Sequence, residues 1–88
     1  MPDEEVVERL SSYIRDRFLD GDPNSELEDT TPLLEWGILT SMNTALLLTW
    51  IRDDFGVEVP VDRLTGQNFK DVGAISAMVT DLLARSRA

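Results

Sequence analysis

The chain has 88 residues, which allows one small domain with one core, and its 42% hydrophobic content is typical of a folded globular protein. It has neither cysteine nor histidine, which excludes disulfides, thiolate nucleophiles and the usual zinc sites, and leaves no side chain that titrates near neutrality without perturbation. The formal net charge of −9 argues against nucleic acid and anionic membranes as partners and favours basic protein surfaces.

The first predicted element is a helix from about Asp3 to Leu19. Its apolar residues recur every three to four positions, which is the spacing of one buried helix face. They are Val6, Val7, Leu10, Ile14 and Phe18, flanked by Tyr13. Acidic residues at positions 3–5 suit the positive end of a helix, and Gly21 and Pro23 are expected to end it.

A long loop, residues 20–39, separates this helix from the next. Its apolar residues Leu27, Leu33, Leu34, Trp36 and Ile38 predict that it is pinned across the helices, with Trp36 sealing the core. Oxygen-bearing side chains after position 20 invite comparison with a calcium-binding loop. The comparison fails at two positions. Ser25 stands where the sharp turn of such a loop needs glycine, and Thr31 stands where calcium needs a bidentate glutamate. We therefore expect a solvated acidic loop.

The second helix is predicted from Ser41 to Phe55, with Gly56 as its stop. Thr40 is a favoured N-cap type, so Ser41 falls in the first turn with its hydroxyl near solvent. Unpaired backbone N–H groups and the positive helix end would favour a phosphate ester there. Taken alone, however, a serine in a first turn usually only helps to cap the helix. The inward residues of this helix are predicted to be Leu47, Leu48, Ile51 and Phe55.

After Gly56, residues 57–59 alternate like a strand, but no partner strand is predicted. A short helical turn is expected near Asp62–Leu64, and a last helix from about Asp71 to Arg85. The apolar face of the last helix comprises Val72, Ile75, Met78, Val79, Leu82 and Leu83. The prediction is an all-α fold, a small four-helix bundle of three long helices and a short third one, in a single domain over residues 1–88.

Three segments share residues and spacing with one known family. The segment Gly37–Met42 (GILTSM) opens the second helix, Asp53–Pro60 ends it, and Asp29–Leu34 leads to it. Together they resemble the acyl and peptidyl carrier proteins, small four-helix domains that carry substrates on a 4′-phosphopantetheine arm. The resemblance covers nearly the whole chain and is greatest to stand-alone peptidyl carriers and D-alanyl carrier proteins.

This resemblance implies a non-catalytic carrier whose arm is attached to Ser41. A phosphopantetheinyl transferase would supply the arm from coenzyme A. An adenylating or acyl-loading enzyme would then place an acyl or aminoacyl group on it as a thioester, for downstream condensing or tailoring enzymes. The most similar context is nonribosomal peptide-like secondary metabolism. A D-alanyl carrier for cell-envelope esterification is the alternative within the family, and an unmodified helical adaptor is the alternative from another class.

Two positions differ from the family pattern. Thr40 stands where the family usually has aspartate, and Leu46 where acidic fatty-acid carriers typically have glutamate. Both changes resemble the peptidyl-carrier style of recognition, in which apolar contacts dominate. We therefore expect Thr40, Met42, Leu46 and Trp50 to contact partners. For Trp50, packing against the long loop is an equal alternative.

The chain shows no sign of a membrane segment. No apolar run approaches the ~20 residues of a spanning helix, and the acidic start, residues 1–5, is unlike a signal peptide. We expect a cytoplasmic monomer without membrane insertion.

Overall fold

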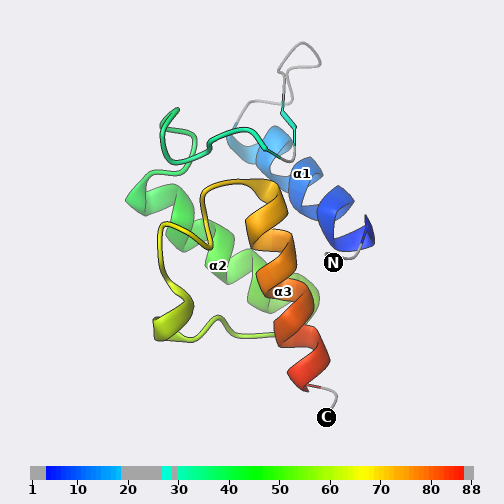
Figure 1. The fold of residues 1–88 in the computed structure, drawn as a ribbon. Coiled ribbons are helices and arrows are strands. Elements are labelled where there is room, and N and C mark those ends of the chain that lie inside the picture. Colours follow the sequence, from blue (N-terminus) through cyan, green and yellow to red (C-terminus); the bar gives the residue numbers. More distant parts are fainter. Residues whose placement is uncertain (1–3, 19–26, 29, 87–88) are drawn as a thin grey trace.

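The computed structural model describes residues 4–18, 27–28 and 30–86. In chain order it contains α1 (Glu4–Phe18), α2 (Ser41–Phe55), the 3₁₀ turn η1 (Val61–Arg63) and α3 (Val72–Ser86) (Figure 1). The all-helical class is confirmed, and the described residues include no strand. The predicted short third helix is a single 3₁₀ turn that begins one residue early, so the described part of the chain holds three α-helices.

The helix boundaries follow from local chemistry. The carboxylate oxygen Oδ1 of Asp71 accepts a hydrogen bond from the backbone N–H of Ala74 at 2.7 Å. Asp71 therefore acts as a cap, and α3 begins one residue later than predicted. Gly56 ends α2 with φ 71°, and its N–H donates to the carbonyl of Arg52, as a left-handed C-terminal glycine does. The predicted first-helix ends at Asp3 and Leu19, and its breakers Gly21 and Pro23, lie outside the described residues.

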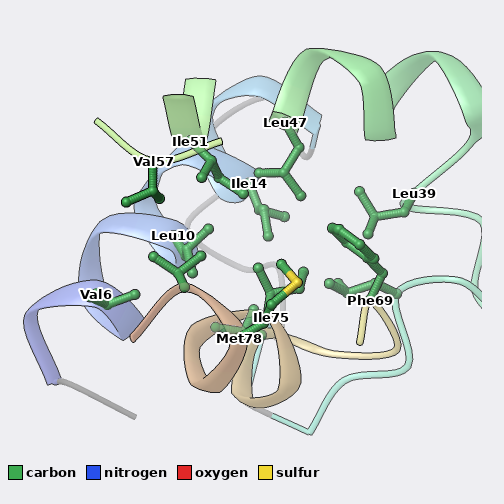
Figure 2. Packing of buried hydrophobic residues seen from close by; sticks show 13 residues of the cluster. Val6, Leu10, Ile14, Leu39, Leu47, Ile51, Val57, Phe69, Ile75 and Met78 are labelled. Carbon is green, nitrogen blue, oxygen red and sulfur yellow. The ribbon is translucent and has the colours of Figure 1, made fainter. Parts of the chain in front are cut away.

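The three helices share one core. Figure 1 shows α1 and α3 side by side, and Figure 2 shows buried side chains of all three helices pointing toward one another. The helices contribute Val6, Leu10, Ile14, Leu47, Ile51, Val72, Ile75, Met78 and Val79, all at most 3% exposed. The central residues of the predicted stripes of α1 and α3 are thus confirmed as buried, whereas Val7, Phe18, Leu82 and Leu83 at their ends or edges are only partly buried. In α2 the fully buried stripe is narrower than predicted, because Leu48 and Phe55 are only partly buried.

The last part of the loop before α2, residues 33–39, is held at both of its ends. The N–H of Leu33 donates to the carbonyl of Lys70 at 2.8 Å, and the N–H groups of Ile38 and Leu39 donate to the carbonyl of Leu33 at 2.9 and 3.1 Å. Of the residues predicted to pin the loop, Leu33 is buried and Leu27 and Ile38 are partly buried against the core, which confirms the pinning for them, whereas Leu34 is 40% exposed. Leu39, which was not among the predicted residues, is also buried. The prediction for Trp36 is wrong, because its side chain is 63% exposed. Leu33 and Leu39 fill the core there, and the turn between them carries Trp36 outward.

The segment between α2 and α3 is fixed by buried Val57 and Phe69 and by a set of polar contacts. Arg63 of η1 pairs with Asp81 of α3 at 2.8 Å, and Arg85 pairs with the same carboxylate at 3.1 Å. The side-chain amide of Asn68 donates to the carbonyl of Arg63 at 2.9 Å. These contacts join η1 and the following turn to α3, and so position Leu64 and its neighbours opposite α2.

Two further findings concern the described residues only. None of their helices has the length and apolar character that crossing a membrane requires. No group of three or more acidic side chains within these ranges could hold a metal ion. Residues 20–26 and 29, which include most of the acidic loop compared above with a calcium site, lie outside the described ranges.

Candidate functional site

The start of α2 places Ser41 at the surface. Thr40 has extended backbone angles (φ −89°, ψ 176°), and its Oγ1 accepts a hydrogen bond from the N–H of Asn43 at 3.1 Å. This is the N-cap geometry predicted for Thr40. Ser41 is the first residue of the helix and is exposed. Its hydroxyl is therefore accessible at a helix start, as predicted.

A second residue, which sequence reasoning missed, holds the same turn. The side-chain amide of Asn43 donates to the carbonyl of Ile38 at 2.8 Å, while its backbone N–H donates to Thr40. Asn43 thus links the first turn of α2 to the preceding loop and restricts the path of the chain through Ser41. The signal in the sequence was an amide side chain at the third helical position, where it can reach back to the chain before the cap.

The electrostatic environment of Ser41 suits a phosphate ester. A helix start carries partial positive charge and N–H groups that point outward. The first turn of α2 contains no acidic side chain, and residues 36–51 contain no charged side chain of either sign. No carboxylate on this stretch would therefore repel a phosphodiester. The exposed hydroxyl, the helix end and the absence of like charge all fit a phosphate-linked group at this position.

A pocket of about 190 Å³ opens beside this turn. Thr44 and Leu48 follow Ser41 by three and seven residues, so they share its helix face. The opposite wall comes from the loop before α2 and from the turn after η1. The lining residues are Leu34, Thr44, Leu48, Leu64, Thr65, Gly66 and Phe69. The pocket is thus mainly apolar with two hydroxyls, and sequence reasoning did not find it.

The predicted partner contacts fall into two groups. Met42 and Leu46 are 74% and 52% exposed, and Thr40 is exposed beside Ser41. Trp50 is instead half-buried, because its ring stacks on Tyr13 of α1 with centroids 4.3 Å apart. The structure therefore brings the first three to the surface around Ser41 and turns Trp50 toward α1. Their roles in partner binding stay predictions.

A larger open hollow of about 390 Å³ lies between α1 and the second half of α2. Its walls include Arg9, Tyr13, Arg17, Trp50 and Asp54. Trp50 and Asp54 follow Ser41 by nine and thirteen residues, which at 1.5 Å per residue places them roughly 13–20 Å along the helix from it. This hollow is therefore separate from the surroundings of Ser41.

Comparison with known proteins agrees with this geometry. A family described as the phosphopantetheine attachment site matches residues 17–79. Among solved structures, the chain is 34% identical to one from a crystal structure described as an FAD-dependent dehydrogenase, with a TM-score of 0.75 over 81% of this chain and 99% of that one. No curated protein matches. Because the family match covers most of the 88 residues, the chain belongs to the phosphopantetheine attachment family, whose domains carry 4′-phosphopantetheine.

Proposed function

We propose that the chain is a stand-alone carrier protein that holds an acyl or aminoacyl group as a thioester on a 4′-phosphopantetheine arm at Ser41. The observation that carries this proposal is the exposed hydroxyl of Ser41 at the start of α2, inside the family match and within an uncharged stretch. The GILTSM motif and the apolar helix favour a peptidyl carrier in nonribosomal peptide-like biosynthesis.

Attachment would use the Ser41 oxygen as nucleophile. That oxygen would form a bond to the phosphorus next to pantetheine in coenzyme A, and the bond to the nucleotide phosphate would break, releasing adenosine 3′,5′-bisphosphate. The hydroxyl proton would pass to a base of the transferase, because this chain has no histidine and residues 36–51 around Ser41 contain no carboxylate. The arm, when attached, supplies a terminal thiol that the cysteine-free chain lacks. In this proposal the chain positions its cargo, and its partners catalyse the reactions.

The size of the pocket favours a small cargo. Its volume of about 190 Å³ is similar to that of an engineered cavity of about 150 Å³ that accommodates benzene. It could take part of the arm or one compact side chain, but not a long acyl chain. The hydroxyls of Thr44 and Thr65 could also serve amide groups, which a fatty tail lacks. An aminoacyl or short acyl thioester therefore fits this surface best.

The structural comparison suggests a class for the downstream tailoring enzyme. The matching chain comes from a crystal structure described as an FAD-dependent dehydrogenase, and this chain spans 99% of it. We infer that the tethered cargo is a substrate for such an enzyme, which would take two electrons and two protons from the cargo onto its own flavin. A purified FAD-dependent dehydrogenase mixed with the loaded carrier should then lose its oxidised-flavin absorbance.

Coenzyme A and adenylating enzymes supply this chemistry in the cytoplasm, so we propose that the chain acts there. We also propose that it acts as a monomer. A D-alanyl carrier for cell-envelope esterification stays the alternative within the family. A screen of adenylating enzymes from the same genome across amino acids would separate the two, because the loading enzyme selects the cargo.

Mass spectrometry tests the attachment site. Incubation with coenzyme A and a broad-specificity phosphopantetheinyl transferase should add one phosphopantetheine to the chain, and Ser41→Ala should abolish the addition without changing helical circular dichroism. Ser12→Ala, at an exposed position of α1, is the matched control and should be modified normally. Modification of the Ser41→Ala variant would overturn the site, and an unmodified wild-type chain would favour the adaptor alternative.

A further inference from the structure

We propose that a second pocket on α2, eleven residues beyond Ser41, binds the amine end of a tethered aminoacyl group. This pocket, called here the Arg52 pocket, has a volume of about 180 Å³ and is lined by Leu48, Thr49, Arg52, Glu58 and Val59. The inference rests on the attachment proposed at Ser41. It narrows the cargo to an acyl group that carries a free amine, and it assigns the recognition of that amine to named side chains.

The first observation is that one row of α2 joins Ser41 to the Arg52 pocket. Thr44, Leu48 and Arg52 follow Ser41 by three, seven and eleven residues. At about 100° per residue, all three lie within roughly 60° of Ser41 around the helix axis. A group that is attached to Ser41 and extends toward the end of α2 therefore passes Thr44 and Leu48 before it meets Arg52.

The second observation is that two pockets follow one another along this row. The pocket of about 190 Å³ beside the first turn, called here the Thr44 pocket, shares Leu48 with the Arg52 pocket. Its wall opposite α2 comes largely from the turn after η1, and that of the Arg52 pocket comes from Glu58 and Val59. Both pockets are therefore closed by the segment that connects α2 to α3.

The third observation is a match of lengths. A phosphopantetheine arm has about thirteen bonds between phosphorus and sulfur, which is roughly 15 Å when extended at the rise per bond of a peptide chain. An aminoacyl group adds about three bonds, or roughly 3 Å, before its nitrogen. Arg52 lies about 16 Å from Ser41 along the helix axis. The arm therefore spans the Thr44 pocket, and the amine that it carries reaches the Arg52 pocket.

The charges of the Arg52 pocket select the cargo. Among the described residues Glu58 forms no ion pair, whereas Nε of Arg52 lies 3.9 Å from Oδ1 of Asp53. An aminoacyl thioester ends in an ammonium group and a carbonyl oxygen. The Glu58 carboxylate can accept hydrogen bonds from the ammonium, and the Arg52 guanidinium can donate to the carbonyl oxygen. An acyl group without an amine offers nothing to Glu58.

The backbone fixes the two charged residues relative to each other. The N–H of Gly56 donates to the carbonyl of Arg52 at 3.0 Å, and the left-handed φ of 71° at Gly56 turns the chain back at this point. Glu58 is exposed between buried Val57 and partly buried Val59. Binding of the amine would therefore order little backbone, which lowers its entropic cost.

The test compares two cargoes that differ only in the amine. A broad-specificity phosphopantetheinyl transferase loads the ¹⁵N-labelled chain from coenzyme A analogues that carry an alanyl or a propionyl group through a stable amide in place of the thioester. In ¹H–¹⁵N correlation spectra, the backbone amides of Arg52 and Glu58 should shift in the alanyl-loaded chain relative to the propionyl-loaded chain. The amides of Thr44 and Thr65 should shift alike in both, because the same arm passes them.

A charge-removing variant tests the role of Glu58. Glu58→Gln should reduce the alanyl-specific shift at Arg52 by about two- to fivefold, the range expected for loss of an exposed ion pair. Glu35→Gln removes the same charge at an exposed position outside both pockets, and it should leave the shift unchanged. Circular dichroism of both variants confirms that the fold is retained.

Three results would overturn the proposal. They are equal shifts at Arg52 and Glu58 for the two cargoes, shifts confined to the Thr44 pocket, and an alanyl-specific shift that persists in Glu58→Gln. A wild-type chain that takes up neither cargo would instead contradict the attachment at Ser41. Failure of this inference and failure of the proposed function are therefore distinguishable.

Discussion

Thr40 occupies the position at which carrier proteins usually have aspartate, and its contacts explain why the fold accepts the change. Its hydroxyl oxygen accepts the N–H of Asn43 at 3.1 Å, which is the bond that an aspartate carboxylate makes at an N-cap. The structural task is therefore retained, and the negative charge is lost. The substitution therefore makes the electrostatic potential beside Ser41 less negative, and a docking enzyme would meet that potential.

Substitutions at Thr40 should separate these two roles. Thr40→Val removes the acceptor and should lower the free energy of unfolding by about 1 kcal/mol. Thr40→Asp keeps an acceptor and adds a negative charge at the positive helix end, so it should be at least as stable as wild type. Urea unfolding followed by circular dichroism measures both. An equal loss in the two variants would show that the Thr40 hydroxyl does not cap α2.

At the level of the elements, an aromatic cluster joins α1 to α2. The Tyr13 ring stacks on Trp50, Trp50 meets Phe55 edge to face with centroids 5.3 Å apart, and the Arg9 guanidinium lies 4.8 Å from the centre of the Phe55 ring. Arg9 also pairs with Asp54. This cluster lies on the half of α2 away from Ser41, so it stabilises the helix that presents the serine without contacting the site.

Phe55→Ala tests the contribution of this cluster. The ring is partly buried, so the loss should fall near the lower end of the range for buried aromatics, about 3 kcal/mol in the free energy of unfolding. Denaturant unfolding gives the value, and Leu46→Ala on the exposed side of α2 serves as the control. A change below about 1 kcal/mol would show that Phe55 does not support the packing of α1 on α2.

The pair between Arg63 and Asp81 should make the tie between η1 and α3 sensitive to acid. The pKa of Asp81 lies below its ordinary value of 3.8, chiefly because Arg63 donates a hydrogen bond to the carboxylate, with Arg85 acting in the same direction and desolvation opposing them. A lowered folded-state pKa contributes stability that is present above the unfolded value and is lost as pH falls through the folded value.

The melting temperature of Asp81→Asn should therefore lie below that of wild type near neutral pH. This difference should shrink as the pH falls below 3.8, because protonation removes the same charge from the wild-type chain. Thermal melts at a series of pH values measure it, with Asp62→Asn at an exposed position of η1 as the control. A difference that stays constant down to the acid transition would contradict the role of this pair.

The sequence predicted the positions of the helices better than the conformations of the loops that pack against them. Helical spacing and the cap at Thr40 located α2 correctly, because both signals are local. Trp36 was misplaced, since its exposure depends on Leu33 and Leu39 filling the core on either side of it. The pocket wall at Leu64–Gly66 was missed for a similar reason. Its place opposite α2 depends on contacts such as Arg63–Asp81, which join positions 18 residues apart.

Across the whole molecule, the excess of acidic residues should oppose folding at low ionic strength. Seventeen acidic and eight basic side chains are confined to a fold with a radius of gyration of 12.2 Å. At about 10 mM salt the Debye length is roughly 30 Å, so the charges interact across the whole fold, and repulsion among the excess acidic side chains dominates because the net charge is −9. The exposed ion pairs add little, since such pairs contribute at most about 1 kcal/mol each. Net repulsion therefore outweighs pairing.

Salt should accordingly stabilise this protein. Raising NaCl from about 10 to about 150 mM shortens the Debye length to roughly 8 Å, and the melting temperature should rise by a few degrees as distant repulsion is screened. Thermal melts in NaCl, repeated in sodium fluoride to separate screening from ion-specific effects, measure the change. A melting temperature that falls with salt would mean that the ion pairs outweigh the repulsion.

The contrast between the two tryptophans has an optical consequence. Trp36 is 63% exposed in the turn that precedes α2, whereas Trp50 is half-buried against Tyr13. The Trp36 indole therefore emits from a largely aqueous environment and is open to a dissolved quencher such as acrylamide, while Trp50 is shielded on one face. Emission from Trp36 would shift to shorter wavelength when a protein covers it. The unlabelled chain thus carries its own fluorescent reporter of docking, with Trp50 as an internal reference.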